Sequence, residues 1–353
     1  MMVKRGDFMD IGLIGFGGVG KALIKSIIEK KQRLKEEGIE LNVKYILSSK
    51  TRIFDNQGID LENLYDFMKY YNDISKYPSG GAKVNDFNEI INSIKFDLII
   101  EMTPSNLING EPGYSYIKAA LENNINVITS NKGPIALYYD ELYEIALRNN
   151  VQLAIGCTTG GALPTINGGI IDLAGSYIFS IEGVLNGTSN FILEEMENNN
   201  CEFETALKEA LKLGIAEPTN PSQDVEGKDA AAKLLILTNV LLKQNKKFED
   251  IDIEGITKIK LDDVKNLKKN GKRYKLIATT TIKNNRLKMT VKPEIVDKDN
   301  IFYHVNGKNK AVKYKSDTLG ELFLMGGASG VESAAASILR DLINLLRGYR
   351  FIR

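Results

Sequence analysis

The sequence predicts an α/β protein with two domains, a parallel-sheet domain at the N-terminus followed by a mixed α+β domain. The 353 residues exceed the length at which one hydrophobic core stops growing, which indicates two domains. In the first half, short apolar runs alternate with helical patterns, as in the βαβ units of a parallel sheet. In the second half, residues 274–284 and 286–296 alternate polar and apolar side chains like antiparallel strands.

The first domain is expected to cover residues 1–150 and to begin with a strand that runs into glycines. Because each apolar run is followed by a helical pattern, its strands are expected to be parallel. The expected strands are 10–17, 42–49, 96–103 and 125–130, and the expected helices are 20–36, 115–124 and 138–150. A further strand, 151–156, leads out of this domain.

The second domain is expected to cover residues 151–317. Besides the two alternating segments, a strand is expected at 177–186 and helices around 203–213 and 225–243. A helix over 331–347 is expected to return to the first domain together with the rest of 318–353.

Composition argues against several classes of function. The 46 basic and 45 acidic residues nearly cancel, so no global field attracts nucleic acid or an anionic membrane. The apolar runs are far shorter than the roughly 20 residues of a membrane span. Asp7 and Asp10 interrupt the N-terminal segment, which argues against a signal peptide and for the cytoplasm. With two cysteines, Cys157 and Cys201, and one histidine, we expect reduced thiols and no zinc site.

The segment "GFGGVG" (15–20) fits the GxGxxG pattern, with a strand before it and a helical pattern after it. Gly15 permits a tight turn, Gly17 lets a pyrophosphate approach the backbone, and Gly20 lets helix and strand pack closely. The pattern therefore predicts a Rossmann-type dinucleotide-binding domain. The expected cofactor contacts at this turn are Gly15, Phe16, Gly17, Gly18, Val19 and Gly20.

The end of the second strand bears on the choice between the two nicotinamide dinucleotides. An NAD enzyme usually carries Asp or Glu there for the ribose 2′-hydroxyl, whereas this strand ends in "LSSKTR" (47–52). Ser48, Lys50 and Arg52 suit a 2′-phosphate instead. The sequence favours NADP and leaves NAD open, and an exposed basic loop is the alternative interpretation.

Several downstream segments, in order over nearly the whole chain, resemble homoserine dehydrogenase. They are "TPSN" (103–106), "GEPG" (110–113), "VITSNKGPIA" (127–136), "GGALP" (160–164), "GVLNGTSNFIL" (183–193), "GIAEPTNP" (214–221), "DVEGKDAAAKLLIL" (224–237) and "GGASG" (326–330). The resemblance implies hydride transfer between L-homoserine and L-aspartate 4-semialdehyde, in threonine and methionine biosynthesis. It also implies a small-molecule substrate and a homodimer formed through the substrate-binding domain.

Asp229 and Lys233 are four residues apart and so lie on one helical face. From spacing alone they form either a surface ion pair or a pair presented to a cleft. In homoserine dehydrogenases the matching lysine is proposed as the acid/base group. The resemblance therefore implies Lys233 as the catalytic candidate, with Glu217 and Asp229 as substrate ligands.

Lys132 follows the strand 125–130, at the edge of a parallel sheet where ligands bind. The resemblance places it beside nicotinamide and substrate, so it is a rival proton donor. Thr103 and Pro104 are implied to border the nicotinamide. The remaining implied contacts are Gly187 and Thr188 with the substrate, and Gly327 and Gly330 with the cofactor.

The chain departs from the family pattern in several places. Many homoserine dehydrogenases have a glutamate at the position of Gly156 that helps to bind a monovalent cation. Without that charge, only the carbonyls of Thr159, Gly161 and Leu163 remain as ligands for a weak sodium site, and no other metal is expected. Only 23 residues follow Gly330, so the C-terminal regulatory ACT domain of many members is not expected.

Two other functions compete with this interpretation. "AIGCTTGGALP" (154–164) resembles the nucleophile segment of phosphorylating aldehyde dehydrogenases, in which Cys157 would be activated by a base such as His304. A non-catalytic NADP-binding regulator is the other alternative.

Overall fold

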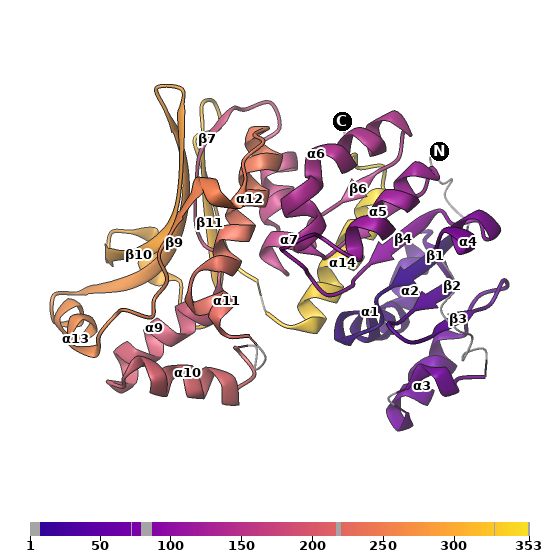
Figure 1. Cartoon of the computed structure of the whole chain (residues 1–353), viewed down its shortest axis with the longest axis horizontal. Helices are drawn as coiled ribbons and strands as arrows, with labels where there is room; N and C mark the ends of the chain where they lie inside the picture. The colour runs from indigo at the N-terminus through magenta and orange to yellow at the C-terminus, as the bar shows by residue number, and fades with distance from the viewer. Residues whose placement is uncertain (1–7, 72, 79–86, 217–219, 328, 352–353) are drawn as a thin grey trace. The chain divides into compact units, whose positions relative to one another are not determined.

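The computed structural model of the chain describes residues 8–71, 73–78, 87–216, 220–327 and 329–351. The chain divides into two compact units, one formed by Met1–Thr158 with Gly330–Arg353 and the other by Thr159–Ser329. Each unit carries a six-stranded sheet among the described residues (Figure 1). The α/β fold class is confirmed.

The first unit is built on a sheet with the strand order β3-β2-β1-β4-β5-β6. Neighbouring strands are parallel except for β2 and β3, which are antiparallel. The strands are β1 (Phe8–Ile14), β2 (Glu40–Leu47), β3 (Arg52–Phe54), β4 (Leu98–Glu101), β5 (Asn126–Thr129) and β6 (Leu153–Ala154). Because β2 and β4 flank β1, the strand order reverses beside β1, and ligands of open α/β sheets bind at such a point.

Helices cover this sheet, so that β4 is buried along its whole length. The helices are α1 (Gly18–Glu29), α2 (Lys31–Glu36), α3 (Leu61–Tyr70), α4 (Phe87–Ser93), α5 (Gly113–Glu122), α6 (Lys132–Arg148), α7 (Cys157–Gly160) and α14 (Val331–Leu346), with a 3₁₀ turn at Ile74–Lys76. The C-terminal helix α14 packs beside α1 (Figure 1) and contributes Ala335, Ile338, Leu339 and Leu342 to the core of the first unit.

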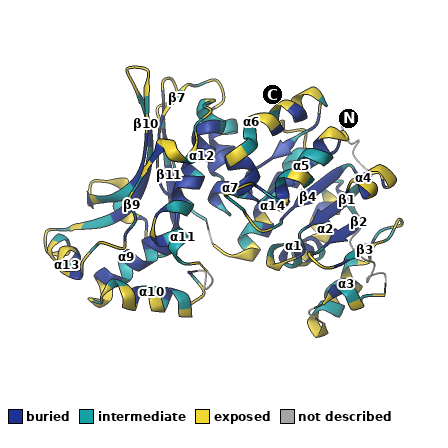
Figure 2. Cartoon of the chain, in the orientation of Figure 1, coloured by how far each residue is buried: buried dark blue, intermediate teal, exposed yellow. Residues whose placement is uncertain are grey.

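The second unit is built on a sheet with the order β12-β11-β7-β9-β10-β8. Its strands are β7 (Ile178–Val184), β8 (Ile251–Ile253), β9 (Lys272–Lys283), β10 (Arg286–Asp297), β11 (Lys310–Ser316) and β12 (Glu321–Gly326). Its helices are α8 (Thr165–Asn167), a π-helical turn at Gly168–Asp172, α9 (Gly187–Asn199), α10 (Phe203–Lys212), α11 (Ser222–Val225), α12 (Lys228–Leu242) and α13 (Leu261–Lys269), with 3₁₀ turns at Phe248–Asp250 and Ile301–His304. Figure 2 shows the inner turns of α12 as buried, as expected for a helix that contacts β7 and β9.

Several expected boundaries differ from the structure. The first unit runs to Thr158 and not to residue 150. The chain joins the first unit at Gly330 and not at residue 318, because β12 pairs with β11 in the sheet of the second unit. The helix expected over 225–243 is divided at Gly227, whose φ of +81° is left-handed and ends α11 before α12 begins. The helix expected over 20–36 is likewise two helices that meet at Lys30.

None of the helices in the described part of the chain is both long enough and apolar enough to span a membrane.

Candidate functional site

The glycine turn joins β1 to α1 at the point where the strand order reverses. Gly15 has a φ of +92°, and a Cβ there would lie 2.5 Å from the backbone of Met102, so the position requires glycine. A Cβ on Gly17 would meet no heavy atom within 4 Å, and no side chain caps the N-terminus of α1. Backbone N–H groups at a helix N-terminus bind phosphate. The turn therefore fits a dinucleotide pyrophosphate.

The other residues of this turn pack against the first unit. Phe16 is buried and its ring lies against Gly20, while Val19 packs on the core. A Cβ on Gly18 would lie 2.9 Å from the side chain of Val331, at the start of α14. Gly330, just ahead of α14, is therefore close to the glycine turn. Gly327 belongs to the second unit, where a Cβ on it would lie 2.7 Å from the backbone nitrogen of Leu163.

A tight turn follows β2, in the place where the sequence predicts a 2′-phosphate site. The Ser48 hydroxyl accepts from the Thr51 N–H at 3.1 Å and donates to the Thr51 carbonyl at 3.0 Å. Lys50 is exposed at the tip of the turn, whereas Arg52 is half-buried in β3. Burial raises the pKa of Tyr45 to about 12, an effect that Arg52 partly offsets. Lys50 is thus the more accessible of the two cations.

A buried carboxylate organises the loops after β4 and β5. Glu101 is fully buried and accepts from the Thr103 N–H at 2.7 Å and from the Thr129 hydroxyl at 2.6 Å. The Thr103 hydroxyl and the Asn131 amide also donate to it. Burial raises its pKa, and these hydrogen bonds oppose that effect. Glu101 was not predicted as a site residue, although an acid at the end of the apolar run "FDLII" is a signal for it.

Asn131 in turn starts the helix that carries Lys132. Its Oδ1 accepts from the Gly133 N–H at 3.1 Å and from the Ser105 hydroxyl at 2.9 Å, so it caps α6 and ties it to the loop of Pro104. Lys132 is the first residue of α6 and is half-buried. The Glu101 network therefore fixes Thr103, Pro104 and Lys132 relative to one another.

In the second unit, Lys233 and Asp229 form an ordered pair on α12. The Lys233 Nζ lies 2.6 Å from the Asp229 Oδ2 and donates to the Leu185 carbonyl at 2.9 Å. Their side chains are only 14% and 11% exposed, so the pair is not a solvated surface ion pair. Three alanines, Ala230 to Ala232, favour helix between them.

An asparagine ahead of α9 joins this pair to a second carboxylate. The Asn186 Nδ2 donates to the Asp224 Oδ1 at 2.6 Å and to the Asp229 Oδ2 at 2.8 Å. Burial raises the pKa of Asp224, the charge of Asp229 adds to the effect, and Asn186 and Lys233 oppose it. We refer to Asp224 and Asp229 as the carboxylate pair. Asp224 was not predicted as a site residue, although it stands five residues before Asp229 in the same motif.

The first turn of α9 lies directly after Asn186, which caps it by accepting from the Ser189 N–H at 2.8 Å. A Cβ on Gly187 would lie 2.6 Å from the Lys308 carbonyl oxygen, so only glycine fits there. The Thr188 hydroxyl donates to the Ile215 carbonyl at 3.0 Å. Glu217, the other predicted substrate ligand, lies outside the described residues.

Comparison with known proteins decides the family. A family model described as homoserine dehydrogenase matches residues 164–343, and one described as the homoserine dehydrogenase NAD-binding domain matches residues 15–155. The chain belongs to the homoserine dehydrogenase family. The resemblance found in the sequence is confirmed. Homoserine dehydrogenases are oxidoreductases that act on a CH–OH group with a nicotinamide cofactor.

Relatives of full length support the assignment. A homoserine dehydrogenase of Methanocaldococcus jannaschii is 38% identical over 96% of this chain and 98% of its own. An NAD(+)-dependent homoserine dehydrogenase of Pseudomonas canavaninivorans is 34% identical over 95% of each. A solved structure of a hyperthermophilic archaeal homoserine dehydrogenase mutant in complex with NADPH has a TM-score of 0.83 at 28% identity and covers 98% of this chain and 100% of that one.

The cysteine of the rival interpretation is buried in this homoserine dehydrogenase fold. Cys157 is 6% exposed, belongs to the apolar core of the first unit, and its Sγ lies 3.5 Å from the Ala334 carbonyl oxygen. His304, the expected base, is exposed in the second unit with its Nε2 3.1 Å from the Lys298 carbonyl oxygen. The family assignment sets the aldehyde dehydrogenase and regulator alternatives aside.

The residues of the predicted sodium site lie at the start of the second unit. The Leu163 carbonyl accepts from the Thr165 N–H at 2.8 Å, the Thr159 hydroxyl bonds the Thr165 hydroxyl at 2.6 Å, and Gly161 has a φ of +60°. Within the described residues no group of His, Cys, Asp or Glu side chains is arranged to hold a metal ion. The sodium site stays a prediction.

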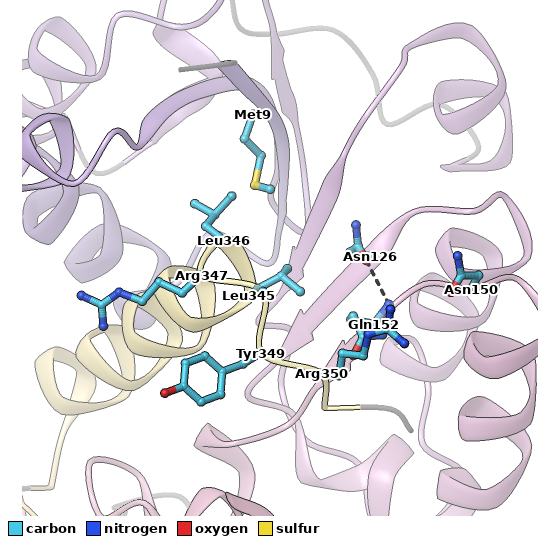
Figure 3. A pocket seen from close by; sticks show the side chains of 10 residues that line it. Met9, Asn126, Asn150, Gln152, Leu345, Leu346, Arg347, Tyr349 and Arg350 are labelled. Atoms are coloured by element: carbon cyan, nitrogen blue, oxygen red, sulfur yellow. Dashed lines mark hydrogen bonds between the residues drawn. The ribbon is translucent and has the colours of Figure 1, made fainter. Parts of the chain in front are cut away.

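A hollow of about 320 Å³ lies at the amino ends of β1, β5 and β6, at the end of the first sheet opposite to the glycine turn (Figure 3). Met9, Asn126 and Gln152 line it together with C-terminal residues after Asn344. Because nucleotides bind at the carboxyl ends of parallel strands, this hollow is not the cofactor site of a homoserine dehydrogenase.

Proposed function

We propose that the chain interconverts L-aspartate 4-semialdehyde and L-homoserine with NADP as the coenzyme and Lys233 as the group that moves the proton. The observation that carries the proposal is the hydrogen-bonded pair of Lys233 and Asp229 beside Asp224. The reaction is a step in the biosynthesis of threonine and methionine.

Lys233 is held in a fixed direction, as an acid/base group requires. Two acceptors, the Asp229 carboxylate and the Leu185 carbonyl, bind its Nζ. An ammonium has three donors, so a third remains for the substrate oxygen. When the aldehyde is reduced, negative charge develops on that oxygen, and an ammonium at this place stabilises the charge and then donates the proton.

The carboxylate pair supplies the negative charge that an amino-acid substrate requires. L-Homoserine carries an ammonium, which pairs with carboxylates. Asn186 donates to one oxygen of Asp224 and to one of Asp229, so it holds the two side chains together beside the Lys233 ammonium. We assign Asp229 and Asp224 to substrate binding, with Gly187 and Thr188 shaping the site through the first turn of α9. Glu217 stays a prediction as the third acid.

The first unit has the shape to bind a nicotinamide dinucleotide, and that cofactor would supply the hydride for the reaction. Gly15, Gly17 and Gly20 meet the steric requirements of the pyrophosphate turn. The turn after β2 offers Ser48 and the exposed Lys50, with no acid between Leu47 and Arg52, which supports NADP as the preferred coenzyme. Thr103, Pro104, Gly327 and Gly330 are proposed as further contacts.

Lys132 is the second candidate for the proton donor. It begins α6 at the carboxyl end of β5, the edge of the sheet where nucleotides bind. We rank Lys233 ahead of it because Lys233 is bonded to the carboxylate pair that we assign to substrate.

We also propose a homodimer. In support, three large apolar side chains on strands of the second sheet are exposed: Phe179 by 42%, Ile295 by 54% and Met325 by 52%. Light scattering after size exclusion measures the mass of the particle, and a monomer of 39.2 kDa would contradict the proposal.

The experiment that tests the proposed function mixes the protein, NADPH and L-aspartate 4-semialdehyde and follows nicotinamide absorbance. We expect NADPH oxidation that does not depend on added phosphate, with L-homoserine as the product. Phosphate-dependent reduction of NADP by the aldehyde would favour the chemistry of an aldehyde dehydrogenase instead.

A further inference from the structure

A buried lysine lies in the middle of the second unit, outside the residues assigned above. Lys275 of β9 is 1% exposed. Its Nζ donates to the Asn190 Oδ1 at 2.8 Å and to the Val305 carbonyl at 2.5 Å. Among the described residues no carboxylate lies within ion-pair distance of it. Burying an amine without a counter-charge costs free energy, so the hydrogen bonds to these two acceptors must offset that cost.

Both partners of Lys275 belong to a contact between α9 and residues 305–309, which we call the 305–309 loop. The Asn190 Nδ2 donates to the Val305 carbonyl at 3.0 Å and to the Gly307 carbonyl at 2.7 Å. The Gly307 N–H donates to the carboxylate of Glu194, one turn further along α9. Lys275 thus completes a network that holds the loop along one face of the helix.

The same loop lies against the first residue of α9. The Lys308 carbonyl oxygen would be 2.6 Å from a Cβ on Gly187, so backbone touches backbone there. The residue before Gly187 is Asn186, whose amide joins the carboxylate pair. A shift of the loop therefore moves Gly187 and with it the bridging amide.

We propose that Lys275 is a positioning residue for the amino-acid substrate, which acts by holding the 305–309 loop against Gly187. It touches neither substrate nor cofactor in this account. Through the loop it fixes the first turn of α9 and the place of Asn186 between the two carboxylates. The inference rests on the proposed function.

The pKa of Lys275 reflects burial more than pairing with a carboxylate. Burial lowers its pKa to about 8, and Arg273 on the same strand acts in the same direction. Glu194 and Glu197 of α9 act in the opposite direction. Arg273 forms its own ion pair with Glu197 at 3.1 Å and donates to the Tyr303 carbonyl at 3.2 Å. Arg273 also donates to the Asn306 Oδ1 at 3.0 Å, so it too holds the 305–309 loop. Thr280 of the same strand is buried, its hydroxyl bonds the Thr238 hydroxyl at 2.7 Å, and it provides the matched control.

The test compares steady-state oxidation of L-homoserine by the wild type and by Lys275→Met, Lys275→Gln and Thr280→Val at saturating NADP. We expect Lys275→Met to raise the KM for homoserine about tenfold, as for the loss of buried hydrogen bonds, with kcat and NADP affinity little changed. Lys275→Gln keeps an N–H donor for the Val305 carbonyl and should restore most of the lost affinity. Thr280→Val, which removes a buried hydrogen bond away from the loop, should lower the melting temperature and leave the KM near the wild-type value.

Two results would overturn the inference. One is a folded Lys275→Met enzyme with an unchanged KM, and the other is an equal rise in KM for Thr280→Val, which would indicate general damage to the second unit. If Lys275→Met does not fold, Asn190→Ala replaces it, and the same comparison of KM decides. An inactive wild type would instead overturn the proposed function, so the two failures are distinguishable.

Discussion

The Nζ of Lys233 lies 2.6 Å from the Oδ2 of Asp229, one turn away on the same helix. The same Oδ2 also accepts from the Asn186 amide at 2.8 Å, so Asp229 is fixed from two sides. Lys233 is fixed in turn by the Leu185 carbonyl. These bonds hold the Lys233 ammonium in one direction, which an i,i+4 pair at a solvated surface would not do.

Asp224→Asn should weaken substrate binding more than turnover. The variant keeps the shape of the side chain and removes one of the two charges that we assign to the substrate ammonium. We expect the KM for L-homoserine to rise about tenfold to a hundredfold, in the range for loss of one partner of a buried charge pair, while kcat changes less. Steady-state kinetics measure both constants. A lower kcat with an unchanged KM would contradict the assignment.

The wild-type enzyme should also lose substrate affinity in mild acid because the pKa of Asp224 is raised, mainly by burial. As the pH falls, Asp224 takes up a proton at a higher pH than an exposed aspartate and loses the charge that binds the substrate. The KM for homoserine should therefore rise as the pH falls. This acidic limb of the curve of KM against pH should be absent in Asp224→Asn. The same limb in both proteins would assign it to another group.

Lys50→Glu should change the preference between coenzymes. A carboxylate at the tip of the turn after β2 repels a 2′-phosphate, so we expect kcat/KM with NADP to fall about tenfold and kcat/KM with NAD to fall less. Arg52→Glu is the comparison, because Arg52 is half-buried in β3 and should also lower stability. Equal losses with NADP and NAD in Lys50→Glu would show that the 2′-phosphate binds elsewhere.

Much of this site can be predicted from the sequence because its motifs consist of residues that are close together in the chain. GxGxxG after a strand predicts the turn at Gly15, and four residues between Asp229 and Lys233 predict one helical face. The bonds from Asn186 to Asp224 and Asp229 span 38 and 43 residues, and no local spacing reports such a contact. They depend on how α9, α11 and α12 pack.

The fold class also follows from hydrophobic periodicity, whereas boundaries depend on tertiary pairing. Residues 318–326 look like the start of the returning segment in the sequence. Residues 321–326 form β12 because β11 offers an edge to pair with. Glu101 was missed for a related reason, since a charge at the end of an apolar strand is expected at the surface. Here Thr103, Thr129 and Asn131 bind it inside the first unit.

Cys157→Ser should retain activity. The thiol is 6% exposed and belongs to the apolar core, so the change should lower stability slightly and leave kcat within about twofold of the wild type. Circular dichroism and the NADPH assay on the same sample separate the two effects. A folded Cys157→Ser protein without activity would contradict a mechanism that needs only hydride and proton transfer.

The stability contributed by position 275 should depend on pH in the alkaline range. The pKa of Lys275 is lowered from 10.5 to about 8 in the folded chain. Between these values the unfolded chain binds a proton that the folded chain does not, so the free energy of unfolding rises with pH. Relative to Lys275→Met, the wild type should gain about 3 kcal/mol at most across this window. Urea unfolding of both proteins at several pH values measures it, and a constant difference would contradict a buried titrating amine.

The central claim, that Lys233 moves the proton, is tested most directly by the turnover number of Lys233→Met with homoserine and NADP. We expect kcat to fall by roughly two to four orders of magnitude, the range for loss of a general acid, while the dissociation constant of NADPH, measured by fluorescence, stays at the wild-type value. Lys132→Met, measured beside it, should lose less turnover than Lys233→Met. Near-normal turnover in a folded Lys233→Met enzyme would contradict the account and move the role to Lys132.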